Sequence, residues 1–350
     1  MSLWTDYLTM HGAVFDGDTV VSFGDAGAEL VAARDHAVVC DLSTLGVIRV
    51  AGADAAAFLQ GQLTNDVAAL TPGASQYAAW CSPKGRVLAN FVVVRTEDTF
   101  ELLVHASLLA SIRKRLGMFV LRSKVTLEDV SAATVRLGIA GNRARTAIQD
   151  ACGTVPPLHR VAATASASVL ALPGGRYVTF APPQIAPALW ERLTASARPA
   201  GAGAWQWLTI RAGVPVITPS TADQFVPQAA NLDALGGINF QKGCYTGQEI
   251  VARTQYLGRL KERLVLAHVD GAAPGPGARL YSPAFDAQAC GIVVNAAAAP
   301  AGGSDLLAVL QLAAADSGDV RVDARDGRRL VLLPLPYTLP VAAPRRGRIA

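Results

Sequence analysis

The sequence predicts an α+β protein of three modules, the last of them an all-β, barrel-like module. Three observations support this prediction. Strand and helix patterns alternate over residues 46–129, as in a layered α+β domain. A second set of such patterns covers residues 133–218. After residue 264 only short strand patterns remain, separated by Gly, Pro and Asp turns.

The elements expected within these modules also suggest how the chain divides into domains. The length of 350 residues suits two or three domains. We expect residues 1–45 and 130–240 to form one discontinuous α+β domain and residues 46–129 to form a second. Residues 241–263 then link these domains to a C-terminal β-barrel domain, residues 264–350.

In the first α+β domain we expect a short N-terminal helix, strands at 20–23 and 38–42, and a helix at 26–37. After residue 130 we expect strands at 135–141, 168–172 and 177–181, with helices at 142–152 and 186–197. The pattern of residues 204–212 is compatible with either a helix or a strand.

In the second domain we expect strands at 46–52, 76–81, 87–94, 100–104 and 123–128, with helices at 55–60 and 107–116. Asp54 and Ser107 precede these helices and are expected to cap them, because their side chains accept hydrogen bonds from free backbone amides. The turn at 82–85 contains Pro and Gly and predicts a hairpin.

The barrel strands are expected at 263–269, 278–282, 289–295, 305–311, 320–322 and 329–333. The Pro- and Arg-rich end, residues 341–350, is expected to be frayed.

Composition excludes several classes of protein. The chain is 51% hydrophobic and 17% charged, with a formal net charge of +4, which does not by itself argue for nucleic acid binding. Five separate cysteines without a C-x-x-C pair indicate neither a disulfide framework nor a metal motif. The N-terminus lacks the features of a signal peptide, and no apolar run is long enough to span a membrane. We therefore expect a cytoplasmic protein with no membrane partner.

The richest chemistry lies in residues 242–249, KGCYTGQE. Lys242 precedes Cys244 by two residues, and a nearby cation favours the reactive thiolate form. Gly243 and Gly247 permit a tight turn that presents the thiol. The alternative is a small, buried cysteine in a turn, which is the usual position of a free cysteine. The apolar residues that follow are too few to decide between helix and strand.

The same residues carry a family resemblance. KGCYTGQE, preceded by QFVPQAANLDALGGINFQ, resembles the signature of the YgfZ family. These are folate-binding-type proteins related to the T-protein (aminomethyltransferase) of the glycine cleavage system and to mitochondrial iron–sulfur assembly factors. The resemblance implies a three-module T-protein-like fold around a central folate cavity. It also implies tetrahydrofolate as the cofactor, with no metal held by a single chain.

The resemblance assigns roles to individual residues. Cys244 would be the catalytic residue and would be accessible from the folate cavity. The residues expected to support it are Lys242, Gly243, Tyr245, Gly247, Gln248 and Glu249.

Four residues are expected to contact folate: Asn65, Asp66, Arg211 and Gln224. Asn65 and Asp66 belong to a motif, residues 60–67, that resembles a T-protein segment near the cavity; alternatively they only shape a turn. Arg211 stands where T-proteins carry a glutamate, and its planar fork would suit the carboxylates of a folate tail. A surface arginine is the alternative.

One departure from the T-protein pattern concerns the reaction itself. Residues 81–91 resemble a T-protein segment that ends in paired aspartates, one of them essential for aminomethyl transfer. Here Ala89 and Asn90 occupy those positions, and neither can carry the negative charge that such proton handling requires. The resemblance therefore implies the fold and argues against aminomethyltransferase activity.

Three functions follow as hypotheses. The first is a tetrahydrofolate-binding accessory protein that supports the assembly, repair or activity of iron–sulfur enzymes, including tRNA-modifying ones, through Cys244. The second is a folate-dependent one-carbon transferase, and the third is a non-catalytic adaptor. The expected partners are iron–sulfur enzymes or assembly proteins. Direct tRNA contact would use the basic residues of 111–115 or those of 253–263 (Arg253, Arg259, Lys261 and Arg263), which otherwise form solvated helix faces.

Overall fold

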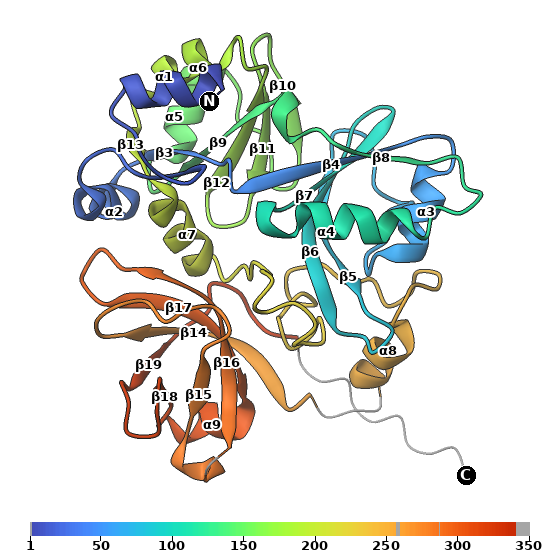
Figure 1. Cartoon of the computed structure of the whole chain (residues 1–350), viewed down its shortest axis with the longest axis vertical. Helices are drawn as coiled ribbons and strands as arrows, with labels where there is room; N and C mark the ends of the chain where they lie inside the picture. Colours follow the sequence, from blue (N-terminus) through green and yellow to red (C-terminus); the bar gives the residue numbers. More distant parts are fainter. Residues whose placement is uncertain (1, 257–259, 287, 341–350) are drawn as a thin grey trace.

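The computed structural model describes residues 2–256, 260–286 and 288–340. Arg259 and the tail at 341–350, for which we made predictions, lie outside these ranges. Three β-sheets and their helices are arranged around a long irregular segment, residues 212–247, drawn in yellow and orange in Figure 1. Among the described residues, no helix is both long enough and apolar enough to cross a membrane.

The first sheet is mixed and has the strand order β10-β11-β12-β9-β3-β13. β3 (Val38–Asp41) lies between β9 (Val135–Ala140) and β13 (Arg198–Ala200), and it is parallel only to β13. The remaining strands are β10 (Val161–Ala163), β11 (Ser168–Leu172) and β12 (Arg176–Ala181). A small hairpin, β1 (Val14–Asp16) and β2 (Thr19–Ser22), precedes this sheet.

Helices cover both faces of the first sheet because its strands alternate their buried side chains between two cores. Val39 packs into a core with α1 (Leu3–Met10), α5 (Ala144–Cys152) and α6 (Ala186–Thr194). Val38 and Cys40 face the other way, toward α2 (Ala26–Asp35) and α7 (Ala202–Arg211). The segment at 204–212, which sequence left open between helix and strand, is therefore helical. In Figure 1, α7 lies between the first sheet and the C-terminal sheet.

The second sheet is antiparallel, with the order β5-β6-β7-β4-β8. Its strands are β4 (Leu45–Ala51), β5 (Ser75–Cys81), β6 (Val87–Arg95), β7 (Thr99–His105) and β8 (Thr126–Asp129), and its helices are α3 (Ala55–Gln62) and α4 (Ala106–Gly117). The hairpin turn at 82–85 forms as expected between β5 and β6.

The third sheet is antiparallel and curled, with the order β18-β15-β16-β17-β14-β19. Its strands are β14 (Glu262–Val269), β15 (Arg279–Tyr281), β16 (Ala289–Ala298), β17 (Ser304–Gln311), β18 (Arg321–Val322) and β19 (Leu330–Leu333). A single bridge between Arg321 and Arg329 brings the two edges together, so the sheet is a half-barrel. The sequence missed α9 (Leu312–Ser317), the two short 3₁₀ helices, Ser131–Ala133 and Pro283–Phe285, and the short strands β1, β10 and β13 of the first module.

Both capping predictions are wrong. The Asp54 carboxylate makes no cap bond to α3; it accepts the Lys124 N–H at 2.7 Å and so holds the segment before β8. At α4 the cap is His105, whose ring accepts the Ser107 N–H. The first outcome depends on a contact with a residue 70 positions away, which a short sequence window does not contain, whereas the second depends on His105, two positions before Ser107.

One large hydrophobic core connects the three modules. It includes Val178 of the first sheet, Phe91 of the second, and Leu307 of the third. Phe225 and Leu232 of the irregular segment are buried in the same core. The segment 212–247 therefore acts as packing between the modules, and this positions everything it carries.

Candidate functional site

The KGCYTGQE segment, residues 242–249, comprises the end of the irregular segment and the start of α8 (Gln248–Tyr256). Cys244 is exposed, and the other four cysteines are buried or half-buried. The neighbouring side chain, Tyr245, is buried. Tyr245 therefore anchors the segment, and the Cys244 thiol is left at the surface. The alternative of a buried cysteine in this turn is wrong.

Lys242 anchors the segment from the inside. It is only 8% exposed, and its Nζ donates to the carbonyl oxygens of Gln60 at 2.5 Å and Leu63 at 2.7 Å. These carbonyls end α3, where the helix dipole favours a cation. The ammonium also lies 4.8 Å from the centre of the Tyr245 ring. Lys242 therefore ties the Cys244 loop to the second module.

Burial lowers the pKa of Lys242 to about 8, although Asp66 and Cys244 act in the opposite direction. The cost of removing the ammonium from water thus exceeds the gain from these two neighbours.

Gly247 fixes the other end of the segment. Its φ of +81° favours glycine, and an added Cβ would lie 2.5 Å from the carbonyl oxygen of Ser82 and 2.9 Å from Cα of Gly85. The loop therefore packs backbone to backbone on the β5–β6 hairpin turn. A Cβ on Gly243 would meet no atom within 4 Å, and its φ is not positive. Of the two glycines expected to shape the turn, only Gly247 is required by the geometry.

Gln248 and Glu249 begin α8, where the free backbone amides favour an acidic residue such as Glu249. Gln248 is half-buried and Glu249 is exposed.

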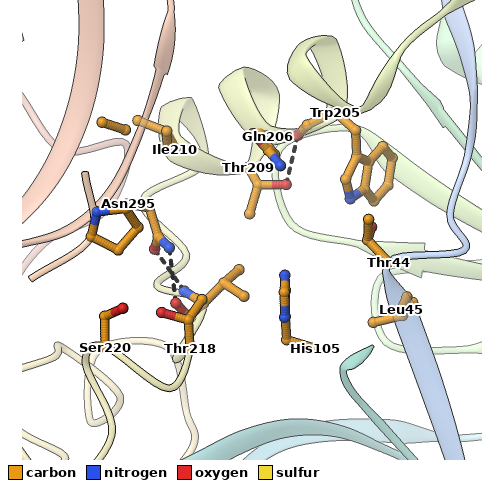
Figure 2. Close-up of a pocket in the computed structure, with 13 residues that line it drawn as sticks. Thr44, Leu45, His105, Trp205, Gln206, Thr209, Ile210, Thr218, Ser220 and Asn295 are labelled. Carbon is orange, nitrogen blue, oxygen red and sulfur yellow. Dashed lines mark hydrogen bonds between the residues drawn. The ribbon is translucent and has the colours of Figure 1, made fainter. Parts of the chain in front are cut away.

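A central cavity of about 400 Å³ lies where the three modules meet (Figure 2). It is lined by α7, by the junction of β3 and β4, by His105 and by the bulged strand β16. The lining residues are Thr44, Leu45, His105, Trp205, Gln206, Thr209, Ile210, Val216, Thr218, Ser220, Pro276, Asn295 and Ala296. His105 is the only one of these lining residues whose side chain can become charged, by protonation of its ring.

Two of these polar side chains serve the framework. Asn295 follows a register shift in β16, and its amide exchanges two 2.8 Å hydrogen bonds with the backbone of Val216, drawn as dashes in Figure 2. A bulge of this kind redirects a side chain, often next to a functional site. Thr209 donates to the Trp205 carbonyl at 2.8 Å.

Two other groups face the open space. Figure 2 shows the His105 ring and the Trp205 indole nitrogen directed into the cavity. Nδ1 of His105 lies 2.7 Å from the Ser107 hydroxyl. Burial lowers the pKa of His105, so a neutral ring is favoured at neutral pH. The cavity is thus a neutral, aromatic and hydrogen-bonding site.

A narrow slot of about 90 Å³ continues the cavity, with which it shares Leu45, His105, Trp205, Thr209 and Val216. Its other walls are mostly apolar side chains of the first two sheets, together with Tyr77, Asn90 and Arg176. Sequence analysis did not single out Arg176, His105 or Trp205. For Arg176 a signal existed: a charged residue begins the otherwise apolar strand RYVTFA.

The four expected folate contacts lie outside both of these linings. Asn65 is buried, and its amide donates to the carbonyls of Tyr77 and Gly236, each at 2.7 Å. Asp66 accepts from Gln60 and from the Ala69 N–H, as a turn-forming residue does.

Arg211 lines a separate cavity of about 510 Å³, with Leu235, Gly236 and Tyr337 among its walls. Its guanidinium lies 3.6 Å from Asp305. Gln224 is exposed, and its carbonyl accepts from Arg86. The contact of these four residues with folate stays a prediction.

Cys244 lines none of the described cavities. The expected opening of the thiol onto the central cavity is therefore not found in the described part of the structure. The described residues also contain no group of three or more His, Cys, Asp or Glu side chains that could hold a metal ion.

Ala89 and Asn90 lie on β6, and Asn90 reaches the slot. The Asn90 amide donates to the Pro215 carbonyl at 2.8 Å and accepts the Ile217 N–H at 2.9 Å. Its two polar atoms thus hold the irregular segment in place. Ala89 is fully buried and apolar.

Comparison with known proteins gives the family context. The family model of the GCVT N-terminal domain matches residues 11–161. The chain is 34% identical over 303 residues to the tRNA-modifying protein YgfZ of Sodalis glossinidius (strain morsitans), covering 85% of this chain and 92% of that protein. It is 34% identical over 305 residues to the tRNA-modifying protein YgfZ of Yersinia pestis (strain Pestoides F), with the same coverage.

Among solved structures, the glycine cleavage system aminomethyltransferase T from Bartonella henselae has a similar fold, with a TM-score of 0.79. The match covers 95% of this chain and 96% of that chain, at 19% sequence identity. This confirms the predicted α+β, T-protein-like fold, including the curled sheet near the C-terminus. At this identity the likeness concerns the fold alone.

Proposed function

The chain belongs to the YgfZ family, and from that premise we propose that it is a tetrahydrofolate-binding accessory protein for iron–sulfur enzymes, including enzymes that modify tRNA. In this proposal folate occupies the central cavity and its slot, and Cys244 acts at the surface. The cytoplasm is the proposed location.

The central cavity is the observation that carries the proposal. Ligand sites are concave, largely apolar and equipped with a few placed polar groups, and they occur preferentially between domains. This cavity has aromatic groups for a planar ring, and its slot offers a guanidinium donor at Arg176. Among the described residues no carboxylate lines either space, so an uncharged heterocycle meets no repulsion from them.

Cys244 suits a role in contact with a partner protein. Its thiol is exposed, while Lys242 and Gly247 fix the loop on both sides. The thiol would exchange disulfides, carry a sulfur atom or hold a transient cluster together with a partner. Stable cluster binding by one chain is disfavoured, because a single cysteine cannot supply the usual four ligands.

The separation of thiol and cavity argues against the one-carbon transferase. A cysteine that replaced the T-protein carboxylate would have to reach the bound folate, but Cys244 is not part of the described linings. Asn90, at the expected carboxylate position, is committed to backbone hydrogen bonds.

Direct contact with tRNA has less support. Arg113, Lys114 and Arg115 of α4 are exposed, although the Arg115 guanidinium lies over the Trp80 ring, 5.3 Å from its centre. Arg263, however, forms a nearly buried pair with Asp233 at 2.7 Å, so it serves the framework. Arg253 and Lys261 of the same basic group are exposed. The proposed partners are iron–sulfur proteins, and tRNA contact would use α4 together with Arg253 and Lys261.

Two measurements test the proposal. Calorimetry should detect tetrahydrofolate binding by the full chain. In cells lacking the chromosomal copy of the protein, the Cys244→Ala variant should fail to sustain iron–sulfur enzyme activity, whereas Cys152→Ala should sustain it. Full function of the Cys244→Ala variant would leave only the adaptor hypothesis. Absence of tetrahydrofolate binding would refute the proposal that tetrahydrofolate is the cofactor.

A further inference from the structure

Arg176 is a buried guanidinium with an unused donor. It begins β12 and is 2% exposed. Its Nε donates to the Pro173 carbonyl and its Nη1 to the Thr209 hydroxyl, both at 2.9 Å. Its Nη2 has no hydrogen-bond partner in the described part of the chain. A buried polar group without a partner is costly, and a buried charge more so, which calls for an explanation.

The surroundings of Arg176 point to a ligand. The side chain lines the slot, 5.5 Å from the centre of the Trp205 ring. No described carboxylate forms an ion pair with it. The Tyr77 hydroxyl also lines the slot and lies near enough to interact with the guanidinium, but no hydrogen bond of normal geometry joins it to Nη2 among the described residues. The guanidinium is therefore a donor without an anion, at the narrow end of an aromatic cavity.

Arg136 on the adjacent strand β9 provides a contrast. It is also buried, at 7% exposure, and one of its nitrogens also lacks a partner. Its Nη1 donates to the Ser131 and Thr134 carbonyls, and the negative charges of Asp41 and Asp129 act on it. It lines none of the described cavities. Arg136 thus has a structural role. Arg176 differs from it in two ways: it lines the slot, and no carboxylate among the described residues forms an ion pair with it.

We propose that Arg176 recognises a ring carbonyl of a planar heterocycle whose ring enters the slot and whose remainder lies in the central cavity. The carbonyl accepts a hydrogen bond from Nη2, and Trp205 and the apolar walls flank the ring. This inference rests on the proposed function, since the pterin ring of tetrahydrofolate carries such a carbonyl at its 4-position. It adds the residue that selects the ligand.

The chemistry of the guanidinium makes this recognition selective. Arginine only donates hydrogen bonds. A 4-oxo group accepts from Nη2, whereas a 4-amino group presents another donor to it. Leaving a buried charged donor unpaired weakens binding by a factor on the order of ten to one hundred. The wild-type protein should therefore prefer the 4-oxo ligand by that factor.

The test compares two ligands on three proteins by calorimetry. The ligands are tetrahydrofolate and its 4-amino-4-deoxy analogue, and the proteins are the wild type, Arg176→Met and the matched control Arg136→Met. We expect Arg176→Met to bind tetrahydrofolate at least about tenfold more weakly and to lose the preference for the 4-oxo ligand. Arg136→Met should keep both the affinity and the preference.

Thermal unfolding without ligand accompanies the binding data. Arg176→Met removes a buried charge that has no ion-pair partner among the described residues, which favours the folded state, but it also removes the donors to the Pro173 carbonyl and the Thr209 hydroxyl. Thermal unfolding therefore establishes that the variant is folded before its binding is compared. Should this variant not fold, Arg176→Gln gives the same readout, because a glutamine amide can donate to a 4-oxo group and can also accept from a 4-amino group.

The outcomes separate the two proposals. In one outcome the wild type binds tetrahydrofolate and the Arg176 variant binds it with the same affinity and the same preference for the 4-oxo ligand. This result overturns the role of Arg176 and leaves the proposed function standing. Wild-type protein that binds neither ligand overturns both.

Discussion

At the scale of single residues, the five cysteines differ in exposure and therefore in reactivity. Burial raises the pKa of Cys40, Cys81, Cys152 and Cys290, which disfavours their thiolates. Cys244 is exposed. Since the thiolate is the nucleophile, iodoacetamide at neutral pH should label Cys244 at least about tenfold faster than the other four. Peptide mapping over time measures this, and Cys244→Ala should remove the fast phase. Equal labelling of all five would contradict the site assignment.

Asn90 is the residue at which an aminomethyl transferase would need a carboxylate. Replacing it with aspartate puts a second acceptor against the Pro215 carbonyl, where the Nδ2 donor now lies at 2.8 Å. We expect Asn90→Asp to lower the free energy of unfolding by about 1–3 kcal/mol, because a buried acceptor loses its partner. We also expect neither this variant nor the wild type to transfer an aminomethyl group. Urea unfolding and an assay with lipoyl carrier protein and tetrahydrofolate measure the two effects; turnover by the variant would show that only the carboxylate is missing.

At the scale of elements, the Cys244 loop is held against the β5–β6 hairpin by Gly247. Gly247→Ala introduces a left-handed alanine and a contact of 2.5 Å with the Ser82 carbonyl oxygen. We expect a loss of about 1–3 kcal/mol in stability and a displaced Cys244. Gly243→Ala is the matched control, because its Cβ meets open space. Thermal unfolding and the alkylation rate of Cys244 should change only in the first variant, and equal effects in both would refute this account of the loop.

The contact between Lys242 and the end of α3 makes stability depend on pH. Burial lowers the pKa of Lys242 to about 8, from 10.5 for an exposed lysine. Between these values the unfolded chain binds more protons than the folded one, so the contribution of Lys242 to the free energy of unfolding rises as pH increases from about 8 to 10.5. Below pH 8 it is constant.

Lys242→Met lacks this titration. The difference in free energy of unfolding between wild type and variant, measured in urea at several pH values, should therefore increase over that window. A flat difference would show that the ammonium is not buried in solution.

At the scale of the whole molecule, Asp305 connects α7 to the C-terminal sheet. Its carboxylate accepts the Trp207 indole N–H at 2.9 Å and lies 2.8 Å from Nδ1 of His268. Asp305→Ala would leave the buried indole donor without its partner, and we expect a loss of about 2–4 kcal/mol. Asp319→Ala is the control, because its pairs with Arg321 and Arg329 are near the surface and should contribute less than about 1 kcal/mol.

Urea unfolding followed by tryptophan fluorescence measures both variants. Since one core includes residues of all three sheets, Asp305→Ala should also lower the stability of the first two modules. A separate transition of the C-terminal sheet, with the rest unchanged, would contradict this coupling.

Local patterns in the sequence were sufficient for most elements, and they left open whether the Cys244 thiol is exposed. Period-two strands bounded by Gly, Pro and Asp predicted the C-terminal sheet, because strand and turn preferences depend on neighbouring residues. Pro and Gly at 82–85 predicted the hairpin turn in the same way. The KGCYTGQE motif identified Cys244 as the distinctive cysteine, and the structure places it at the surface.

What the sequence by itself determined was therefore most of the elements, the fold class and the residue to examine first. The tertiary structure alone decided which groups meet. Lys242 reaches carbonyls at positions 60 and 63, and Arg176 ends beside Trp205 and Thr209. Asp54 bonds to the segment before β8 and leaves its own helix uncapped. These contacts join residues far apart in the chain. Their partners are set by how the modules pack, which no local period or propensity encodes.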